Sequence, residues 1–192
     1  MWRLFKRRWV ILDNYCIVII EMLEKDCVFC SLRESAPLGK LLQTKHFIAF
    51  LDLFPTSPGH SLIVPWRHIN SITQLSSEEW SELLEVVQKT QQLIQTCDLQ
   101  QRYQSMLQKT TIENSHFFIE MALKHTSINI APDGFNHGVN NGLAAGQTIP
   151  HLHWHIIPRY SGDVRDPVGG VRNVIPEKGN YRKLSSFVSA SG

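Results

Sequence analysis

The clearest alternation of polar and apolar positions lies in HLHWHII, residues 151–157. Leu152, Trp154 and Ile156 alternate there with three histidines. A period of two is typical of a half-buried β-strand, in which one set of side chains enters the core and the other set faces away from it. The pattern therefore predicts a strand over 151–157 that presents all three imidazoles on one face.

Two further apolar runs predict an antiparallel pair of strands. FIAFLD (47–52) is rich in β-forming residues, and SLIVP (61–65) ends at a proline. Between them, PTSPGH (55–60) combines proline and glycine, which is turn chemistry. A shorter strand is expected within FNHGVN (135–140).

Helical spacing is strongest over residues 77–95. Ser76 and Glu79 have the spacing of a capping box. Apolar residues recur near one face of this helix, and we expect that face to enter the core: Trp80, Leu83, Leu84, Val87 and Ile94.

Residues 97–127 are harder to interpret. QRYQSMLQK and HFFIEMALK each fit a helix, with Phe117, Met121 and Ala122 close enough around the second one to share a face. The simplest interpretation is a surface excursion that packs on the main body and carries no chemistry.

Together these elements predict an α+β fold, with an antiparallel sheet of about five strands and a long helix packed on one face. A length of 192 residues suits one domain, which we place at 23–184. Residues 1–22 are expected to be an extension outside the core, with 185–192 as a tail. Asp13 and Asn14 interrupt the apolar stretch of the extension, which argues against a signal peptide. A natural start at Met22 is the alternative.

Composition narrows the class of protein. Apolar residues make up 43% and charged residues 19%, which is typical of a globular chain. A net charge of +2 gives no indication of a nucleic-acid surface. Apolar runs stay shorter than the roughly 18 residues that a membrane helix needs, so we expect no membrane partner. Four cysteines are too few for a disulfide scaffold, and they favour a reducing, cytoplasmic setting.

Three interpretations of His151, His153 and His155 compete. The histidines are simply a polar strand face, or they bind a metal ion, or one of them is a nucleophile toward a phosphoryl group. A neutral imidazole is a good nucleophile because its ordinary pKa is about 6.5. The preceding turn favours the third interpretation. Gly146, with the amide of Gln147 and the hydroxyl of Thr148, offers a nest for an anion.

The sequence resembles the histidine triad (HIT) superfamily of nucleotidyl hydrolases and transferases. HLHWHII fits the family's signature of three histidines separated by apolar residues. Three upstream blocks also match in order: CVFC (27–30), AFLDLFPTSPGHSLIVPWRH (49–68) and NNGLAAGQT (140–148). The excursion at 97–127 departs from the family, which usually has a short connection there.

The resemblance implies a role for each histidine. His153 would attack the α-phosphate of a nucleotide and form a covalent nucleotidyl-histidine. His155 would hydrogen-bond the phosphate. The backbone carbonyl of His151 would accept the Nδ1 proton of His153 and leave Nε2 free to attack.

The resemblance also implies a substrate site. Asn140, Gly146, Gln147 and Thr148 would bind phosphate or the leaving group. Asp52 would bind the ribose hydroxyls, with a strand-end cap as the alternative. The base pocket would be lined by Phe29, Leu32, Phe50 and Leu53, for each of which plain core packing is the alternative.

In one branch of the family, a C-x-x-C pair and two histidines bind structural zinc. Cys27, Cys30, His68 and His151 fill those four positions here, so we expect a structural zinc and no catalytic cofactor.

The function that the resemblance implies is a hydrolase acting on dinucleoside polyphosphates or nucleoside phosphoramidates, with adenine nucleotides favoured and a homodimer expected. The alternatives are a nucleotidyltransferase or phosphorylase of the same family, a metalloenzyme, and a nucleotide-binding regulatory protein with weak turnover.

Overall fold

The structure is a computed structural model that describes residues 6–12, 15–21 and 27–183. β1 (Lys6–Leu12) and β2 (Tyr15–Glu21) pair antiparallel in a two-stranded sheet of their own. Met22 and the expected tail at 185–192 lie outside the described residues. Across the described ranges, no helix combines the length and the apolar character needed to cross a membrane.

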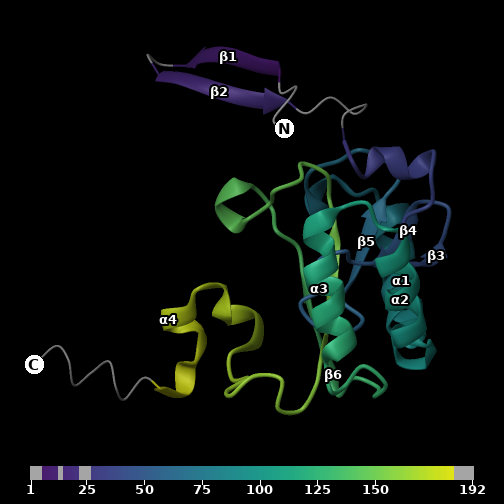
Figure 1. Cartoon of the computed structure of the whole chain (residues 1–192). Helices are drawn as coiled ribbons and strands as arrows, with labels where there is room; N and C mark the ends of the chain where they lie inside the picture. The colour runs from purple at the N-terminus through teal and green to yellow at the C-terminus, as the bar shows by residue number, and fades with distance from the viewer. Residues whose placement is uncertain (1–5, 13–14, 22–26, 184–192) are drawn as a thin grey trace, which may run out of the picture.

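The main sheet has five strands, all of them antiparallel to their neighbours, in the order β3-β4-β5-β7-β6 (Figure 1). Their bounds are Lys40–Gln43, Phe47–Leu51, Ser61–Pro65, Trp154–Arg159 and Gly134–Gly138, in that spatial order. The expected α+β fold is confirmed. β4, β5 and β6 lie where the sequence predicted strands, whereas β3 was not predicted.

The strand that carries the histidines is shorter than predicted. β7 begins at Trp154, so the expectation of a strand from residue 151 is wrong for its first three residues. In this lead-in, Leu152 donates its N–H to the carbonyl of Ile69, outside the sheet. Pro150 stands just before it and has no N–H with which to continue a ladder. His151 and His153 nevertheless both lie beside the Phe29 ring, on the face of the sheet that also carries Phe50.

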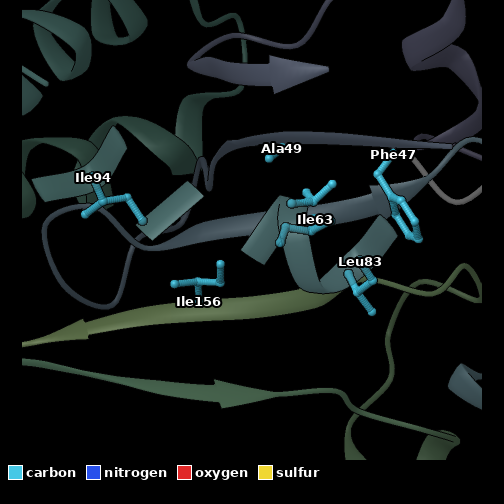
Figure 2. Packing of buried hydrophobic residues seen from close by; sticks show 7 residues of the cluster. Phe47, Ala49, Ile63, Leu83, Ile94 and Ile156 are labelled. Atoms are coloured by element: carbon cyan, nitrogen blue, oxygen red, sulfur yellow. The ribbon is translucent and has the colours of Figure 1, made fainter. Parts of the chain in front are cut away.

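β4 is buried along its whole length because both faces of the sheet are covered. Phe47 and Ala49 face α1 (Ser77–Thr96), where they meet side chains of the helix and of β5 and β7 (Figure 2). Ile48 and Phe50 face the other way and pack with Cys27 and Phe29. This second face, opposite α1, is the side on which the candidate site is built.

α1 begins at the predicted capping box. The Ser76 hydroxyl accepts from the N–H of Glu79, and the Glu79 carboxylate accepts from the N–H of Ser76. The predicted core face is only partly right. Leu83 and Ile94 are buried, but Trp80 and Leu84 are 51% and 63% exposed. The buried face of α1 also includes Glu79, Val86 and Thr90. It therefore lies to one side of Trp80 and Leu84 around the helix.

Residues 97–127 form two helices, α2 (Leu99–Lys109) and α3 (Glu113–Lys124), as their sequence allowed (Figure 1). They pack on each other and on the end of β4 through a cluster of Leu51, Leu99, Tyr103, Met106, Ile119 and Ala122. Phe117 and Met121 point away from this cluster and are exposed, so they do not share a packed face with Ala122. The last helix, α4 (Pro176–Gly179), lies in the C-terminal segment.

The α2–α3 segment also fixes the turn that leads into β5. The buried Tyr103 hydroxyl accepts from the N–H of Gly59 at 2.9 Å. Gly59 has a φ of +84°, which glycine adopts without strain. From the other side, the Ser57 hydroxyl donates to the carbonyl of Pro158, and the Tyr160 hydroxyl donates to that of Pro58. The turn therefore has little freedom, and the next residue is His60.

Truncation of α3 tests whether the segment is part of the folded core. Ile119 is fully buried, so Ile119→Ala should lower the free energy of unfolding by about 2–4 kcal/mol through lost burial and a cavity. Met121→Ala, on the exposed face of the same helix, should change it by less than about 0.5 kcal/mol. Urea denaturation measures both values. Equal, small effects would show that α3 does not pack on the body.

Candidate active site

Two of the three histidines line a pocket of about 550 Å³ on the face of the sheet opposite α1. His155 lies on β7 beside Leu62 of β5, in register. His153 lies just before the strand, and the two rings are 5.1 Å apart between centroids. Asp52 and Thr148 complete the polar lining of this pocket.

A main-chain contact sets the protonation of His153. Its Nδ1 lies 2.8 Å from the carbonyl oxygen of His151. A carbonyl can only accept, so Nδ1 must carry the proton of the neutral ring. Nε2 then has a free lone pair. This is the arrangement that the family resemblance implied for a nucleophile.

His155 is set the opposite way, through His60. The N–H of Thr56 donates to Nδ1 of His60 at 3.3 Å, so His60 carries its proton on Nε2. That proton faces Nδ1 of His155 at 3.0 Å, which leaves His155 with its own proton on Nε2. Nε2 of His155 is buried and has no hydrogen-bond partner among the described residues. A buried N–H without a partner is unusual, and a ligand oxygen can satisfy this one once the atoms that cover it move aside.

Burial keeps both of these imidazoles neutral. Burial, together with the neighbouring His60 and His153, lowers the pKa of His155 to about 4. Burial also lowers the pKa of His60, against the opposing effect of the Asp52 carboxylate. At neutral pH, His155 is therefore a neutral donor.

Asp52 fits both interpretations that its sequence position left open. One carboxylate oxygen accepts from the N–H of Phe54 at 2.9 Å, which is the local cap of a strand end. The other oxygen lies 3.6 Å from Nδ1 of His60. The residue also lines the pocket beside the histidines, where it can receive a sugar hydroxyl.

The rest of the pocket wall is apolar. All four residues expected in a base pocket line it: Phe29, Leu32, Phe50 and Leu53. Phe29 and Phe50 also belong to the core cluster on this face of the sheet, so they serve packing as well. The wall further includes Val28, Pro37, Leu38, Phe54, Leu62, Ile112 and Ile149.

The predicted phosphate turn is only partly in place. Thr148 lines the pocket, but Asn140, Gly146 and Gln147 do not. The Gln147 amide is used at both ends, because its oxygen accepts from Gly142 N–H and its NH₂ donates to the carbonyl of Asn70. The side chain of Gln147 therefore ties the turn together, and its part in binding phosphate or the leaving group stays a prediction.

Cys27, Cys30, His68 and His151 converge on one point. Their ligand atoms all lie within 4.8 Å of one another. Nδ1 of His151 is 3.4 Å from Sγ of Cys27 and 3.6 Å from that of Cys30, and Nδ1 of His68 is 3.2 Å from the latter. Ligand atoms around a tetrahedral zinc ion, with bonds of about 2.0–2.3 Å, are about 3.3–3.8 Å apart.

The tautomer of His151 also fits a metal ligand. Its Nε2 lies 2.9 Å from the carbonyl of Pro65 and must donate to it, so Nδ1 presents a lone pair to the thiols. A ligating histidine usually donates its other N–H in this way. Burial lowers the pKa of His151 to about 4, which keeps that lone pair unprotonated.

His60 and Ile112 are among the residues of the site that were not predicted from the sequence. His60 stands in the PGH part of the turn, and its histidine next to a glycine was an available signal. Ile112 comes from the connection between α2 and α3, and nothing in its local pattern pointed to the pocket.

Comparison with known proteins agrees with this geometry. A family model described as the HIT domain matches residues 33–162, which is more than half of the chain. The chain belongs to the HIT family. The HIT triad in this chain is His151, His153 and His155, and each of the three rings has different hydrogen-bond partners.

Individual HIT proteins are similar over most of the chain. Adenosine 5'-monophosphoramidase hnt1 of Schizosaccharomyces pombe is 29% identical over 69% of this chain and 74% of its own length. AP-4-A phosphorylase of Mycobacterium tuberculosis is 31% identical over 67% of this chain and 51% of its own length. A crystal structure of a HIT family protein from Bacillus anthracis superposes with a TM-score of 0.52 at 27% identity, covering 86% of this chain and 94% of that one.

The buried imidazole of His155 predicts a pH-dependent stability. Its pKa is about 4 in the native state and about 6.5 when exposed, so between these values the unfolded chain binds a proton that the native chain does not. The free energy of unfolding should therefore fall as the pH drops from about 6.5 to about 4. In His155→Gln this fall should be smaller by on the order of 1 kcal/mol. Urea denaturation at a series of pH values measures both slopes, and identical slopes would contradict the assignment.

Proposed function

We propose that this protein is a nucleotide hydrolase that cleaves at the α-phosphate through a covalent nucleotidyl-histidine on His153. One observation carries the proposal. The unprotonated Nε2 of His153 and the unpartnered Nε2–H of His155 belong to adjacent rings in one pocket. A nucleophile next to a donor for a phosphoryl oxygen is what nucleotidyl transfer needs.

The chemistry proceeds in two displacements. The Nε2 lone pair of His153 forms a bond to the α-phosphorus, and the bond from phosphorus to the leaving oxygen or nitrogen breaks with its electron pair on the leaving group. His155 Nε2–H donates to a non-bridging oxygen and stabilises the charge that develops there. Water then attacks the same phosphorus, the P–N bond to His153 breaks, and a nucleoside monophosphate is released.

The substrates we propose are nucleoside phosphoramidates and dinucleoside polyphosphates, with adenine nucleotides favoured. Two relatives carry names that support these classes, one a monophosphoramidase and one an AP-4-A phosphorylase. The second name also supports an alternative function, in which inorganic phosphate replaces water and a nucleoside diphosphate leaves. Product analysis with and without phosphate separates hydrolase from phosphorylase.

Substitution of the nucleophile tests the proposal. His153→Ala should lower kcat for adenosine 5'-phosphoramidate by at least about a thousandfold, because the covalent step is lost. It should also abolish a protein-bound nucleotidyl group that the wild type forms in acid-quenched reactions. Mass spectrometry of the intact chain measures that adduct.

The matched control for this test is His137→Gln, on the neighbouring strand β6. His137 is half-buried and contacts Gln91 and Trp154, but it does not line the pocket. The control should keep kcat within about twofold. A wild-type protein that binds nucleotide but shows neither adduct nor turnover would leave the regulatory binding protein as the better function.

We further propose a structural zinc on Cys27, Cys30, His68 and His151. When bound, zinc would tie the segment before β3 to the lead-in of β7, and it would supply folding energy without chemistry at the phosphate. The support is the convergence of four ligand atoms and the tautomer of His151.

Single thiol substitutions test the zinc. Cys27→Ser should lose about one equivalent of zinc, and its midpoint of thermal unfolding should fall by several degrees. Cys97→Ser, a half-buried cysteine near the start of α2 and outside this cluster, should retain the metal. Elemental analysis of the purified proteins measures zinc content. A zinc-free wild type would contradict the proposal, whereas turnover lost with chelator and restored by zinc would favour the metalloenzyme.

Two further expectations, one from the resemblance and one from the cysteine count, remain part of this proposal. The first is a homodimer, for which the edge strand β6 and the exposed Trp80 and Leu84 of α1 offer surface. The second is a cytoplasmic setting, which is consistent with Cys27, Cys30 and Cys97 forming no disulfide in the described part of the chain.

A further inference from the structure

The α2–α3 segment reaches the substrate pocket. Ile112, the residue between the two helices that precedes Glu113, lines the pocket together with Phe54 and Leu38. The helices themselves pack on the end of β4 through Leu51, which belongs to the α1 side of the sheet. The connection therefore passes around the end of β4 and adds a wall to a pocket on the opposite face.

Ile112 is held in place by both of its main-chain polar groups. Its N–H donates to the Thr110 hydroxyl at 3.2 Å. Its carbonyl accepts from the Ser115 hydroxyl at 2.7 Å and from the Ser115 N–H at 3.0 Å. Thr110 and Ser115 are buried and also bond to each other. The side chain is thus presented by a rigid loop, although 46% of the residue remains exposed.

An apolar surface continues outward from this wall. The Phe54 ring, which lines the pocket, meets Phe118 of α3 edge to face, with centroids 5.5 Å apart. Phe118 meets Phe117 in the same way at 5.4 Å. Ile112, Phe54 and Phe118 are 46%, 40% and 39% exposed. Clustered exposed aromatic residues at a pocket mouth mark a place where an apolar group binds.

The polar groups of the pocket lie elsewhere. Of its fifteen lining residues, four have polar side chains, and three of these, Asp52, His153 and His155, are gathered around His60 and the triad. At the wall formed by Ile112 and Phe54, the nearby Asp52 carboxylate already accepts from the Phe54 N–H with one oxygen, and its other oxygen lies 3.6 Å from His60. A base is therefore held there by burial and ring contacts, and an apolar group on its edge meets no unpaired polar atom.

The geometry also separates base from leaving group. An in-line displacement places the leaving group opposite the attacking nitrogen. The apolar wall begins on the side of the nucleophile, since the Phe29 ring lies 5.4 Å from that of His153 and 6.2 Å from that of Phe50. With the proposed function, the nucleoside lies along this apolar wall, which starts beside the nucleophile.

We propose that Ile112, Phe54 and Phe118 form an apolar subsite, which takes an apolar substituent on the exocyclic edge of the nucleotide base. The inference rests on the proposed function for the direction of the nucleotide in the pocket. It makes Ile112 and Phe118 specificity-determining residues, and it gives the α2–α3 segment a part in substrate selection.

Binding of two product-like nucleotides tests the subsite without turnover. Isothermal titration calorimetry compares AMP with N6-benzyl-AMP, which adds one apolar ring at the base edge. The wild type should bind N6-benzyl-AMP about tenfold more tightly, which corresponds to about 1.4 kcal/mol. In Ile112→Ala and Phe118→Ala this ratio should fall to below about threefold. Met121→Ala, exposed on the same helix and outside the pocket, should keep the tenfold ratio.

The outcomes separate the subsite from the catalytic proposal. A wild type that binds the two nucleotides equally, or an Ile112→Ala protein that keeps the preference, overturns the subsite, and turnover through His153 still stands. A clear preference for N6-benzyl-AMP, lost in both variants, supports the subsite even in a protein without measurable turnover. Binding of neither nucleotide overturns both proposals.

Discussion

The site depends on one hydrogen bond, from Nδ1 of His153 to the main-chain carbonyl of His151. That carbonyl is available because β7 starts only at Trp154. β7 lies between β5 and β6, so the carbonyl of a residue inside the paired part of the strand is directed to a neighbouring strand. Residues 151–153 precede the paired part of β7 and are not held by its ladder. The His151 carbonyl can therefore accept from His153, and the His151 ring can turn toward the thiols of Cys27 and Cys30.

Three histidines two residues apart thereby acquire three different sets of partners, with the proton on Nε2 in His151 and His155 and on Nδ1 in His153. His151 donates from Nε2 to Pro65 and presents Nδ1 to Cys27 and Cys30. His153 donates from Nδ1 and presents a bare Nε2. His155 accepts at Nδ1 from His60 and presents Nε2–H. Because each partner is a main-chain group or a buried ring in a tightly bonded turn, the position of the proton on each ring is set before any ligand enters.

Local patterns predicted those features that depend on nearby residues. The apolar run of β4, the PTSPGH turn and the capping box of α1 each carry their own signal, and each was found in place. β3, with the short sequence KLLQ, has no alternation to detect. The buried face of α1 was misjudged because apolar Trp80 and Leu84 are exposed while Glu79 and Thr90 are buried. Glu79 pairs with Arg67, and this pairing lowers the pKa of Glu79 to about 2. Because Arg67 lies outside α1, the pattern of the helix alone did not predict that Glu79 would be buried.

In the site as well, features set by nearby residues were predicted, and features set by distant contacts were not. Spacing alone brought the histidines to notice, and the resemblance supplied the cysteines and Asp52. The hydrogen bonds of Gln147 and the position of Ile112 depend on contacts with distant segments, and neither was predicted from the sequence. The α2–α3 segment shows how much of the site depends on such distant contacts. Its buried Tyr103 binds Gly59, the neighbour of the histidine that orients His155, and its Ile112 closes the apolar end of the same pocket. The same pair of helices thus fixes the turn next to His60 and supplies a wall residue at the apolar end of the pocket, so both parts of the site depend on the packing of α2 and α3.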